Sequence, residues 1–154
     1  MRGYRLGFDP WALCLFLALM APNFFWSAVP APCDVLRGES ATQALDSFAS
    51  LCQVLSVGLM CLPLYKGQRE KRAFGPWAKA ALGCLCLYYL GWAFYYRGLA
   101  AFWVILLLTL PPCLALLSYI LHRKNWPAAL PAALFTVCHI VYAAVNFLLP
   151  PGFV

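Results

Sequence analysis

The run AAFWVILLLTLPPCLALLSYIL, residues 100–121, decides the class to which this chain belongs. It contains no charged side chain, and it is as long as the stretch of about 20 apolar residues that an α-helix needs to cross the hydrocarbon core of a bilayer. Four further runs have a similar length and character, and they cover residues 11–29, 43–65, 77–96 and 127–149. The sequence therefore predicts an all-α membrane protein, built as a bundle of five transmembrane helices.

The composition of the whole chain agrees with this fold class. Of the 154 residues, 64% are hydrophobic and 10% are charged, whereas soluble globular domains contain roughly 45–50% apolar and about 25% charged residues. The stretches between the five runs are too short to form a soluble domain, so we expect residues 1–154 to form a single transmembrane helical domain. The lipid bilayer is the first partner that this composition implies.

Lysine and arginine are distributed unequally between the two sides of the predicted bundle. With the N-terminus in the cytoplasm, only Arg37 and Arg97 lie on the outer side. The nine basic residues on the inner side are Arg2, Arg5, Lys66, Arg69, Lys71, Arg72, Lys79, Arg123 and Lys124. Basic residues in short loops are retained on the cytoplasmic side. The N-terminus is therefore predicted to be cytoplasmic and the C-terminus extracytoplasmic, and tryptophans near both ends of the spans agree with this placement.

The densest source of the net charge of +6 is the run KGQREKR, residues 66–72. In a membrane protein such a run lies beside the lipid head groups, so we expect the 66–79 loop to contact anionic lipids as well as to fix the topology. The positive charge is explained without a nucleic acid, and we predict none as a partner.

The first apolar run also has an alternative interpretation as a cleaved signal peptide. Arg2 and Arg5 would form its basic region, and SAVPA, residues 27–31, would form its cleavage site. Asp9 within the basic region, and Pro22 and Asn23 within the apolar region, argue against cleavage. We therefore expect the first helix to remain in the protein.

Cysteine and histidine form no motif for catalysis or metal binding. Seven of the eight cysteines lie within predicted spans, where cysteine behaves as a small apolar residue. Only Cys33 lies in a loop, so we expect a free or intermolecular thiol there. His122 and His139 lie at different predicted depths, and neither an H-E-x-x-H nor a paired C-x-x-C spacing is present. We therefore predict no catalytic residue, no metal site and no cofactor, although Asp46 and His139 are groups that acid–base chemistry can use.

Polar side chains within the spans form the candidate site, because each is costly in a membrane. At 100° per residue, they gather on one face of the second, third and fifth runs, at a similar depth toward the outer side. The second run carries Gln43 with three of the candidates, and the third carries an aromatic wall of four tyrosines and Trp92. The candidate ligand-binding residues are Asn23, Asp46, Ser50, Gln53, Tyr88, Tyr95, His139, Tyr142 and Asn146.

Prolines interrupt two of the runs at about this depth. Pro22 lacks a backbone donor and leaves carbonyl oxygens near Ala18 to be satisfied by a neighbouring helix, a side chain such as Asn23, or water. We expect the first helix to bend or open in its outer third, and Pro111 and Pro112 to act similarly in the fourth. Broken helices around a polar interior are typical of transporters. The alternative is that proline is simply frequent in membrane helices and that polar residues hold the helices together.

The loop PAPCDVLRGES, residues 30–40, follows the first helix and is expected to cap the opening. Its Asp34 and Arg37 are candidate outer-loop residues. They are spaced to form a local ion pair if the segment is helical, and selection of a ligand is the alternative role.

Most of the chain resembles a group of small uncharacterised bacterial multi-spanning integral membrane proteins. The resemblance is carried by LGFDPW (6–11), APNFFW (21–26), VPAPCDVLRGES (29–40) and RKNWPAALPAALFTVCHIVYAAVNF (123–147). It implies a multi-pass protein of the bacterial inner (cytoplasmic) membrane and no known activity. The length, five spans and many tryptophans are also similar to the tryptophan-rich sensory (translocator) proteins, which bind porphyrins in a five-helix bundle. The proline-tryptophan-proline signature of that family is not matched by FGPWAK or LTLPPC, so this similarity is one of type.

Two functions remain open from these observations. The first is a membrane protein that binds or passes a small ligand through an outward-facing cavity in the bundle. The second is a non-catalytic partner or assembly subunit, in which the polar faces are buried against another membrane protein or a second copy. They differ in whether the polar faces share one cavity inside a single chain or point outward at lipid.

Overall fold

Five α-helices make up most of the residues that the structure describes. The structure is a computed structural model, and it describes residues 4–66 and 75–148. The helices are α1 (Pro10–Ala28), α2 (Gln43–Cys61), α3 (Pro76–Tyr96), α4 (Phe102–Arg123) and α5 (Trp126–Ala143). Shorter elements are β1 (Tyr4–Leu6), β2 (Pro63–Tyr65), a 3-10 turn η1 (Val35–Arg37) and a π-helical turn η2 (Ala144–Leu148) that continues α5. Of the inner basic residues, Arg2, Arg69, Lys71 and Arg72 lie outside the described ranges, as does the C-terminus.

Four of these helices are long and apolar enough to cross a membrane. They are α1, α2, α4 and α5 extended by η2 to Leu148. The fold is therefore all-helical and suited to a multi-pass membrane protein. The helix α3 has 21 residues, but its tyrosines and Lys79 reduce its hydropathy. A membrane-spanning role for α3 stays a prediction.

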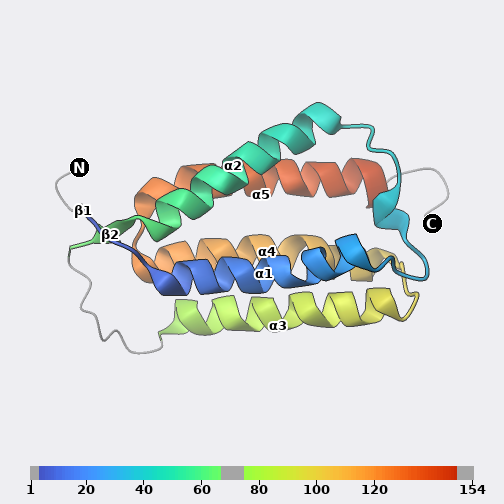
Figure 1. Cartoon of the computed structure of the whole chain (residues 1–154), viewed down its shortest axis with the longest axis horizontal. Helices are drawn as coiled ribbons and strands as arrows, with labels where there is room; N and C mark the ends of the chain where they lie inside the picture. Colours follow the sequence, from blue (N-terminus) through green and yellow to red (C-terminus); the bar gives the residue numbers. More distant parts are fainter. Residues whose placement is uncertain (1–3, 67–74, 149–154) are drawn as a thin grey trace.

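The helices pack in two groups that lie side by side. In Figure 1, α2 and α5 run along one side, and α1, α3 and α4 run along the other. The closest packing joins α3 to α4 and α2 to α5, while α4 and α5 connect the groups and α1 contacts its neighbours more sparsely. Of the most apolar stretch of each helix, 56% is buried in α4 and 17% in α1. The helix α4 is therefore the central one.

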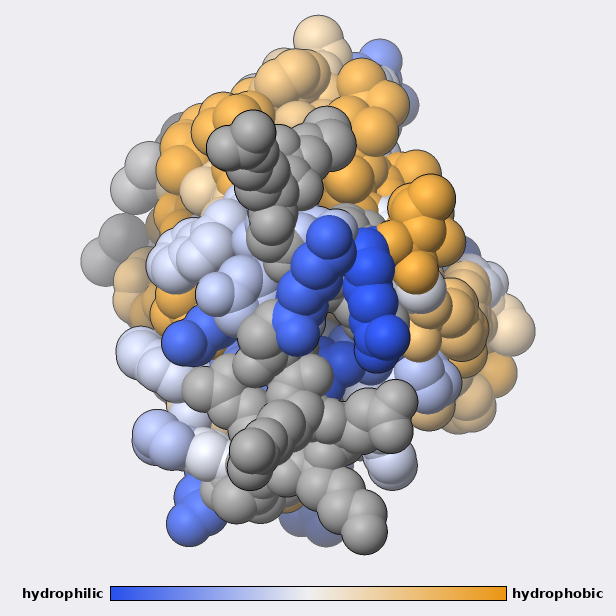
Figure 2. All heavy atoms as spheres, turned by 90° about the vertical axis from the view of Figure 1, so that its left-hand side faces the viewer, coloured by the Kyte–Doolittle hydropathy of each residue, from blue (hydrophilic) through white to orange (hydrophobic). Residues whose placement is uncertain are grey.

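Apolar side chains also cover the outside of the bundle. Trp11, Val54 and Leu130 are each at least 69% exposed. Hydrophobic residues are plain along the top and right of Figure 2, whereas hydrophilic residues gather in the middle and lower left of the end that faces the viewer, where β1 and β2 lie. Exposed apolar side chains on helices of this length suit contact with lipid.

Local sequence explains where several helices begin and end. Asp9 caps α1, because its carboxylate accepts a hydrogen bond from the N–H of Trp11 at 3.2 Å and Pro10 occupies the first turn. The helix α4 ends where Lys124 adopts a left-handed conformation with φ of 52°. The Nδ2 of Asn125 then donates to the carbonyl of Leu59 at 2.8 Å, so a loop residue satisfies the last turn of α2.

The predicted end of the second helix was wrong. We expected it to reach residue 65, but α2 ends at Cys61 and residues Pro63–Tyr65 form β2. Proline has no N–H with which to continue the helical ladder, so Pro63 stops the helix. The strand β2 instead pairs with β1 in an antiparallel two-stranded sheet, with Tyr4 opposite Tyr65.

The prolines do not open either helix. The helix α1 continues through Pro22, and the carbonyl of Ala18, four residues earlier, accepts a hydrogen bond from the hydroxyl of Tyr89 at 2.8 Å. The Nδ2 of Asn23 donates to the carbonyl of Leu19 at 3.1 Å. A neighbouring helix and a local side chain thus replace the missing donor. The helix α4 likewise continues through its two central prolines.

Candidate ligand-binding cavity

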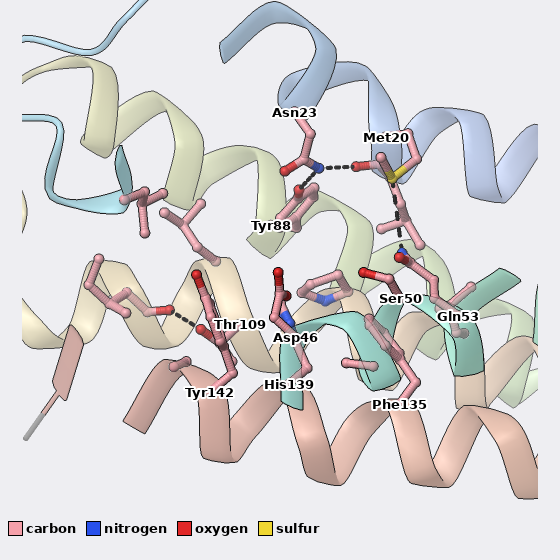
Figure 3. Close-up of a pocket in the computed structure, with 18 of the residues that line it drawn as sticks. Met20, Asn23, Asp46, Ser50, Gln53, Tyr88, Thr109, Phe135, His139 and Tyr142 are labelled. Carbon is pink, nitrogen blue, oxygen red and sulfur yellow. Dashed lines mark hydrogen bonds between the residues drawn. The ribbon is translucent and has the colours of Figure 1, made fainter. Parts of the chain in front are cut away.

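A cavity of about 320 Å³ lies between the helices, and all five contribute to its lining together with η1. Seven of the nine candidate residues line it: Asn23, Asp46, Ser50, Gln53, Tyr88, His139 and Tyr142. They come from α1, α2, α3 and α5, so side chains far apart in the sequence meet around one space inside a single chain (Figure 3). Tyr95 and Asn146 do not line the cavity.

The wall formed by α1 and α3 is a fixed hydrogen-bonded pair. The Nδ2 of Asn23 donates to the hydroxyl of Tyr88 at 2.7 Å and to the backbone of its own helix. Only 3% of Tyr88 is exposed. The pair therefore presents a polar surface whose geometry is set before any ligand arrives.

The wall formed by α2 is polar and less constrained. The side chains of Asp46 and Ser50 form no hydrogen bond with any other residue in the described ranges, and both residues are exposed. The amide of Gln53 makes one weak contact, with its Nε2 4.0 Å from the sulfur of Met20. This wall thus retains free donors and acceptors.

The wall formed by α5 is an aromatic stack. The imidazole of His139 lies parallel to Phe135 at a centroid distance of 5.2 Å and to Tyr142 at 6.5 Å. No hydrogen bond connects the ring nitrogens of His139 to another residue within 4–66 or 75–148. The carboxylate of Asp46 is close enough to act electrostatically on both His139 and Tyr142, and Figure 3 shows Asp46 beside His139.

The remaining lining is largely apolar. Leucine, isoleucine and alanine side chains alternate with aromatic rings, and the indole N–H of buried Trp92 has no hydrogen-bond partner among the described residues. A small number of polar groups in an apolar surround is the usual composition of a small-molecule site.

The outer loop is fastened to the bundle by Asp34. Its carboxylate accepts hydrogen bonds from the indole of Trp26 and the hydroxyl of Tyr95, each at 2.9 Å, and pairs with the guanidinium of Arg37 at 2.8 Å. The same tyrosine oxygen accepts the N–H of Leu36 at 3.1 Å. Leu36 itself lines the cavity, so the loop covers its outer end. The expected local ion pair is present, and Tyr95 holds the loop instead of lining the site.

These contacts also affect the ionisation of Asp34. Partial burial raises its pKa, but hydrogen bonds from Trp26, Tyr95, the N–H of Ala31 and Arg37 favour the carboxylate more strongly. The net result is a pKa below the ordinary aspartate value. The loop is therefore fastened by a charged group.

Asn146 forms hydrogen bonds with the residues that precede α2. Its Oδ1 accepts the N–H of Ala41 and its Nδ2 donates to the hydroxyl of Thr42, each at 2.7 Å. Thr42 precedes α2 but makes no side-chain cap bond, and the Oγ of Ser40 accepts the N–H of Thr42 at 3.1 Å. Asn146 thus ties α5 to the loop before α2.

Asp46 and Arg97 form no ion pair with each other among the described residues. Two ion pairs occur there, and they join Asp34 to Arg37 and Asp9 to Arg123. Arg97 caps the C-terminus of α3 through its backbone. No group of three or more metal-ligating side chains occurs within the described ranges either.

A buried polar cluster at the inner end was missed by sequence reasoning. Asp9 is 1% exposed, and its Oδ2 accepts the hydroxyl of Tyr119 at 3.0 Å and pairs with Arg123 at 2.6 Å. The available signal was the aspartate before Pro10, which marks a helix cap. Its partners lie more than a hundred residues away, and no local pattern identifies them.

No protein-family model, curated protein or solved structure matches this chain.

Proposed function

We propose that this chain is a multi-pass membrane protein that binds a small ligand in the cavity between its helices, or passes it through that cavity. The observation that carries the proposal is the convergence of polar side chains from four helices on one cavity. Asp46 and His139 line it with their hydrogen-bonding capacity unused by the described residues. Polar groups in membrane helices are costly unless they have a partner, and a ligand supplies one.

The topology that we propose has the N-terminus in the cytoplasm, α3 as a fifth span and the C-terminus outside. Its support is the excess of lysine and arginine on one side of the sequence. A bacterial inner membrane is the location implied by the resemblance of the quoted motifs, and anionic head groups are the proposed partners of the 66–79 loop.

A partner or assembly subunit is the second candidate function, either in a larger membrane complex or as a homo-oligomer. It would bury the polar faces against another chain. The exposed apolar side chains are compatible with such a neighbour, but the polar residues of α5, α1 and α3 face inward. The cavity therefore favours ligand binding.

Thermal unfolding of the protein in lipid nanodiscs tests the proposal. A panel of small cationic, neutral and anionic compounds is screened for those that raise the unfolding temperature. A true ligand is expected to stabilise the wild type and His122→Gln, whose histidine lies outside the cavity lining, but not His139→Gln. Equal stabilisation of both histidine variants would place binding elsewhere. If no compound stabilises the protein, and a co-purifying protein is released by both Asp46→Asn and His139→Gln, the result would support the subunit function.

A further inference from the structure

The two ends of the cavity are occupied by protein. At the outer end Leu36 is held by the hydroxyl of Tyr95, within the network that fastens the loop to α1 and α3. At the inner end the lining consists of apolar side chains such as Phe16 and Leu116. One turn beyond Leu116 on α4, Tyr119 is bonded to Asp9. Neither end provides a direct path to water.

The α2 side of the cavity differs from the other sides. Asp46 and Ser50 line the cavity and are nevertheless exposed, whereas Tyr88 and Leu116 on other walls are only 3% and 2% exposed. The packing between α1 and α2 is sparse, and α2 slants away from the rest of the bundle toward its N-terminal end (Figure 1). The cavity therefore has its mouth between the outer halves of α1 and α2.

Large exposed apolar side chains lie beside this mouth, together with the polar residues Gln43 and Ser47 of α2. Phe24, which follows Asn23 on α1, is 59% exposed, and Leu51, which follows Ser50 on α2, is 55% exposed. A mouth on the flank of two such helices opens into the bilayer, so a ligand that uses it must first partition into lipid.

The chemistry of the lining selects among ligands that partition into lipid. Asp46 is the one charged side chain of the described lining, and no lysine or arginine accompanies it. The faces of aromatic rings also favour a cation, because a positive charge is attracted to their π systems, and more strongly when it is desolvated. The aromatic residues of the lining are Phe16, Trp26, Tyr88, Trp92, Phe135, Tyr142 and Phe147. The guanidinium of Arg37 already lies over the ring of Trp26, 4.8 Å from its centroid, so the other rings remain for a ligand.

We propose that the cavity takes an organic monocation with an apolar body, which enters sideways from the bilayer between α1 and α2 and places its cationic head at Asp46. This inference rests on the proposed ligand-binding function and adds the class of ligand and its entrance. The apolar body lies against Phe16, Leu116 and Phe135, and the hydrogen-bond donors of the head reach Asp46 and His139.

Ligand class is tested with three probes that share one apolar body. 4-Phenylbutylammonium, 4-phenylbutanol and 4-phenylbutyrate are added to the protein in nanodiscs of zwitterionic lipid, and binding is measured by equilibrium dialysis with correction for uptake by empty nanodiscs. The ammonium is expected to bind about tenfold or more tightly than the alcohol, the scale of a hydrogen-bonded charge, and the carboxylate is expected not to bind. Asp46→Asn should abolish the preference. The matched control Glu39→Gln, which removes a carboxylate from the outer loop outside the lining, should retain it.

The entrance is tested by association rates of the ammonium probe. Ser50→Phe narrows the mouth and is expected to slow association by about tenfold or more, which corresponds to a barrier about 1.4 kcal/mol higher. Ser47→Phe, on an exposed position of the same helix outside the lining, should leave the rate unchanged. Tyr95→Phe loosens the outer loop and should also leave it unchanged. Faster association in Tyr95→Phe with no effect of Ser50→Phe would place the entrance under the loop and overturn the lateral route.

The outcomes separate this inference from the function on which it rests. Equal binding of the ammonium and the alcohol, with both reduced in His139→Gln, would overturn the cationic preference and leave a ligand-binding cavity. Failure of all three probes would overturn the inference. The broader compound panel would then decide the proposed function independently.

Discussion

Asp9, which caps α1, and Asp46, in the first turn of α2, show how the surroundings of a carboxylate determine its role. Asp9 is buried and has a tyrosine hydroxyl, an arginine and a backbone N–H as partners. Asp46 is exposed at the mouth of a cavity, and its side chain has no partner among the described residues. The first carboxylate is structural, and the second is available to a ligand.

We predict that Asp46 and Arg97 contribute independently to the stability of the protein. Because no ion pair joins them, Asp46→Asn and Arg97→Gln are expected to change the unfolding free energy by less than about 1 kcal/mol each, the range of exposed charges. The double variant should show the sum of the single changes within about 0.5 kcal/mol. Thermal unfolding in detergent measures all four proteins. Strong non-additivity would instead identify a structural pair and remove Asp46 from the candidate site.

The opposite result is expected for Asp9. Asp9→Leu leaves Arg123 and Tyr119 without their shared acceptor in a buried position, and breaking a buried pair from one side costs about 3–5 kcal/mol. Tyr119→Phe removes one hydrogen bond and should cost about 1–3 kcal/mol. Denaturant titration in mixed micelles gives both values. A neutral effect of Asp9→Leu would show that this cluster does not hold the inner end of the bundle together.

At the scale of elements, the sequence predicted the helices well and their long-range partners poorly. Hydropathy located all five helices, because each is a run of about 20 mostly apolar residues. It missed the early end of α2, because pairing of β2 with β1 depends on a segment near the N-terminus. The helical period grouped Tyr95 and Asn146 with the cavity residues, but neither lines the cavity. It could not show that the first fastens the loop and the second caps α2, because both bonds join distant parts of the chain.

The contact between α3 and α4 gives a prediction about Gly91. A Cβ on Gly91 would lie 2.9 Å from the Cβ of Leu107 and 3.3 Å from its carbonyl carbon, so the backbones approach too closely for a side chain. Gly91→Ala is therefore expected to destabilise the protein by about 1–3 kcal/mol, the range for overpacking. Gly83→Ala, on the same helix with open space around its Cβ, is the matched control and should be neutral or slightly stabilising. Equal effects in thermal unfolding would argue against close packing of the two helices.

The outer loop gives a prediction about pH. The folded protein holds the pKa of Asp34 below its ordinary value, so the unfolded state binds a proton more readily than the folded state in acid. The stabilising contribution of Asp34 is complete above the unfolded pKa, near 3.8. It decreases as the pH falls through the lower folded pKa. Asp34→Asn should remove this part of the acid dependence, as measured by unfolding temperature between neutral and acidic pH. A wild-type and a variant curve that stay parallel would contradict the role of the charge.

For the whole molecule, the predicted topology gives the clearest experiment. Cys33 is exposed in the loop before η1, and we expect it to react with a membrane-impermeant thiol reagent added outside intact cells. A reporter inserted at Gln68 should be cytoplasmic. Cys33→Ser is the control for labelling, because Cys14 on α1 and Cys86 on α3 are also exposed. Labelling of Cys33 only after the cells are opened would reverse the orientation.

The cluster around Asp9 has a consequence for how the chain is made. Tyr119 follows Asp9 by 110 residues, so a ribosome releases α1 into the membrane well before the partners of its cap exist. The carboxylate of Asp9 has neither its tyrosine nor its arginine partner until α4 has been made. This end of the bundle therefore completes its packing late in synthesis. In arrested nascent chains, the segment before Pro10 is expected to gain partial protection from protease once β2 has left the ribosome and pairs with β1, and full protection only once Tyr119 and Arg123 have followed. Full protection of chains that end before Tyr119 would show that the contacts of Asp9 add nothing to this end of the bundle.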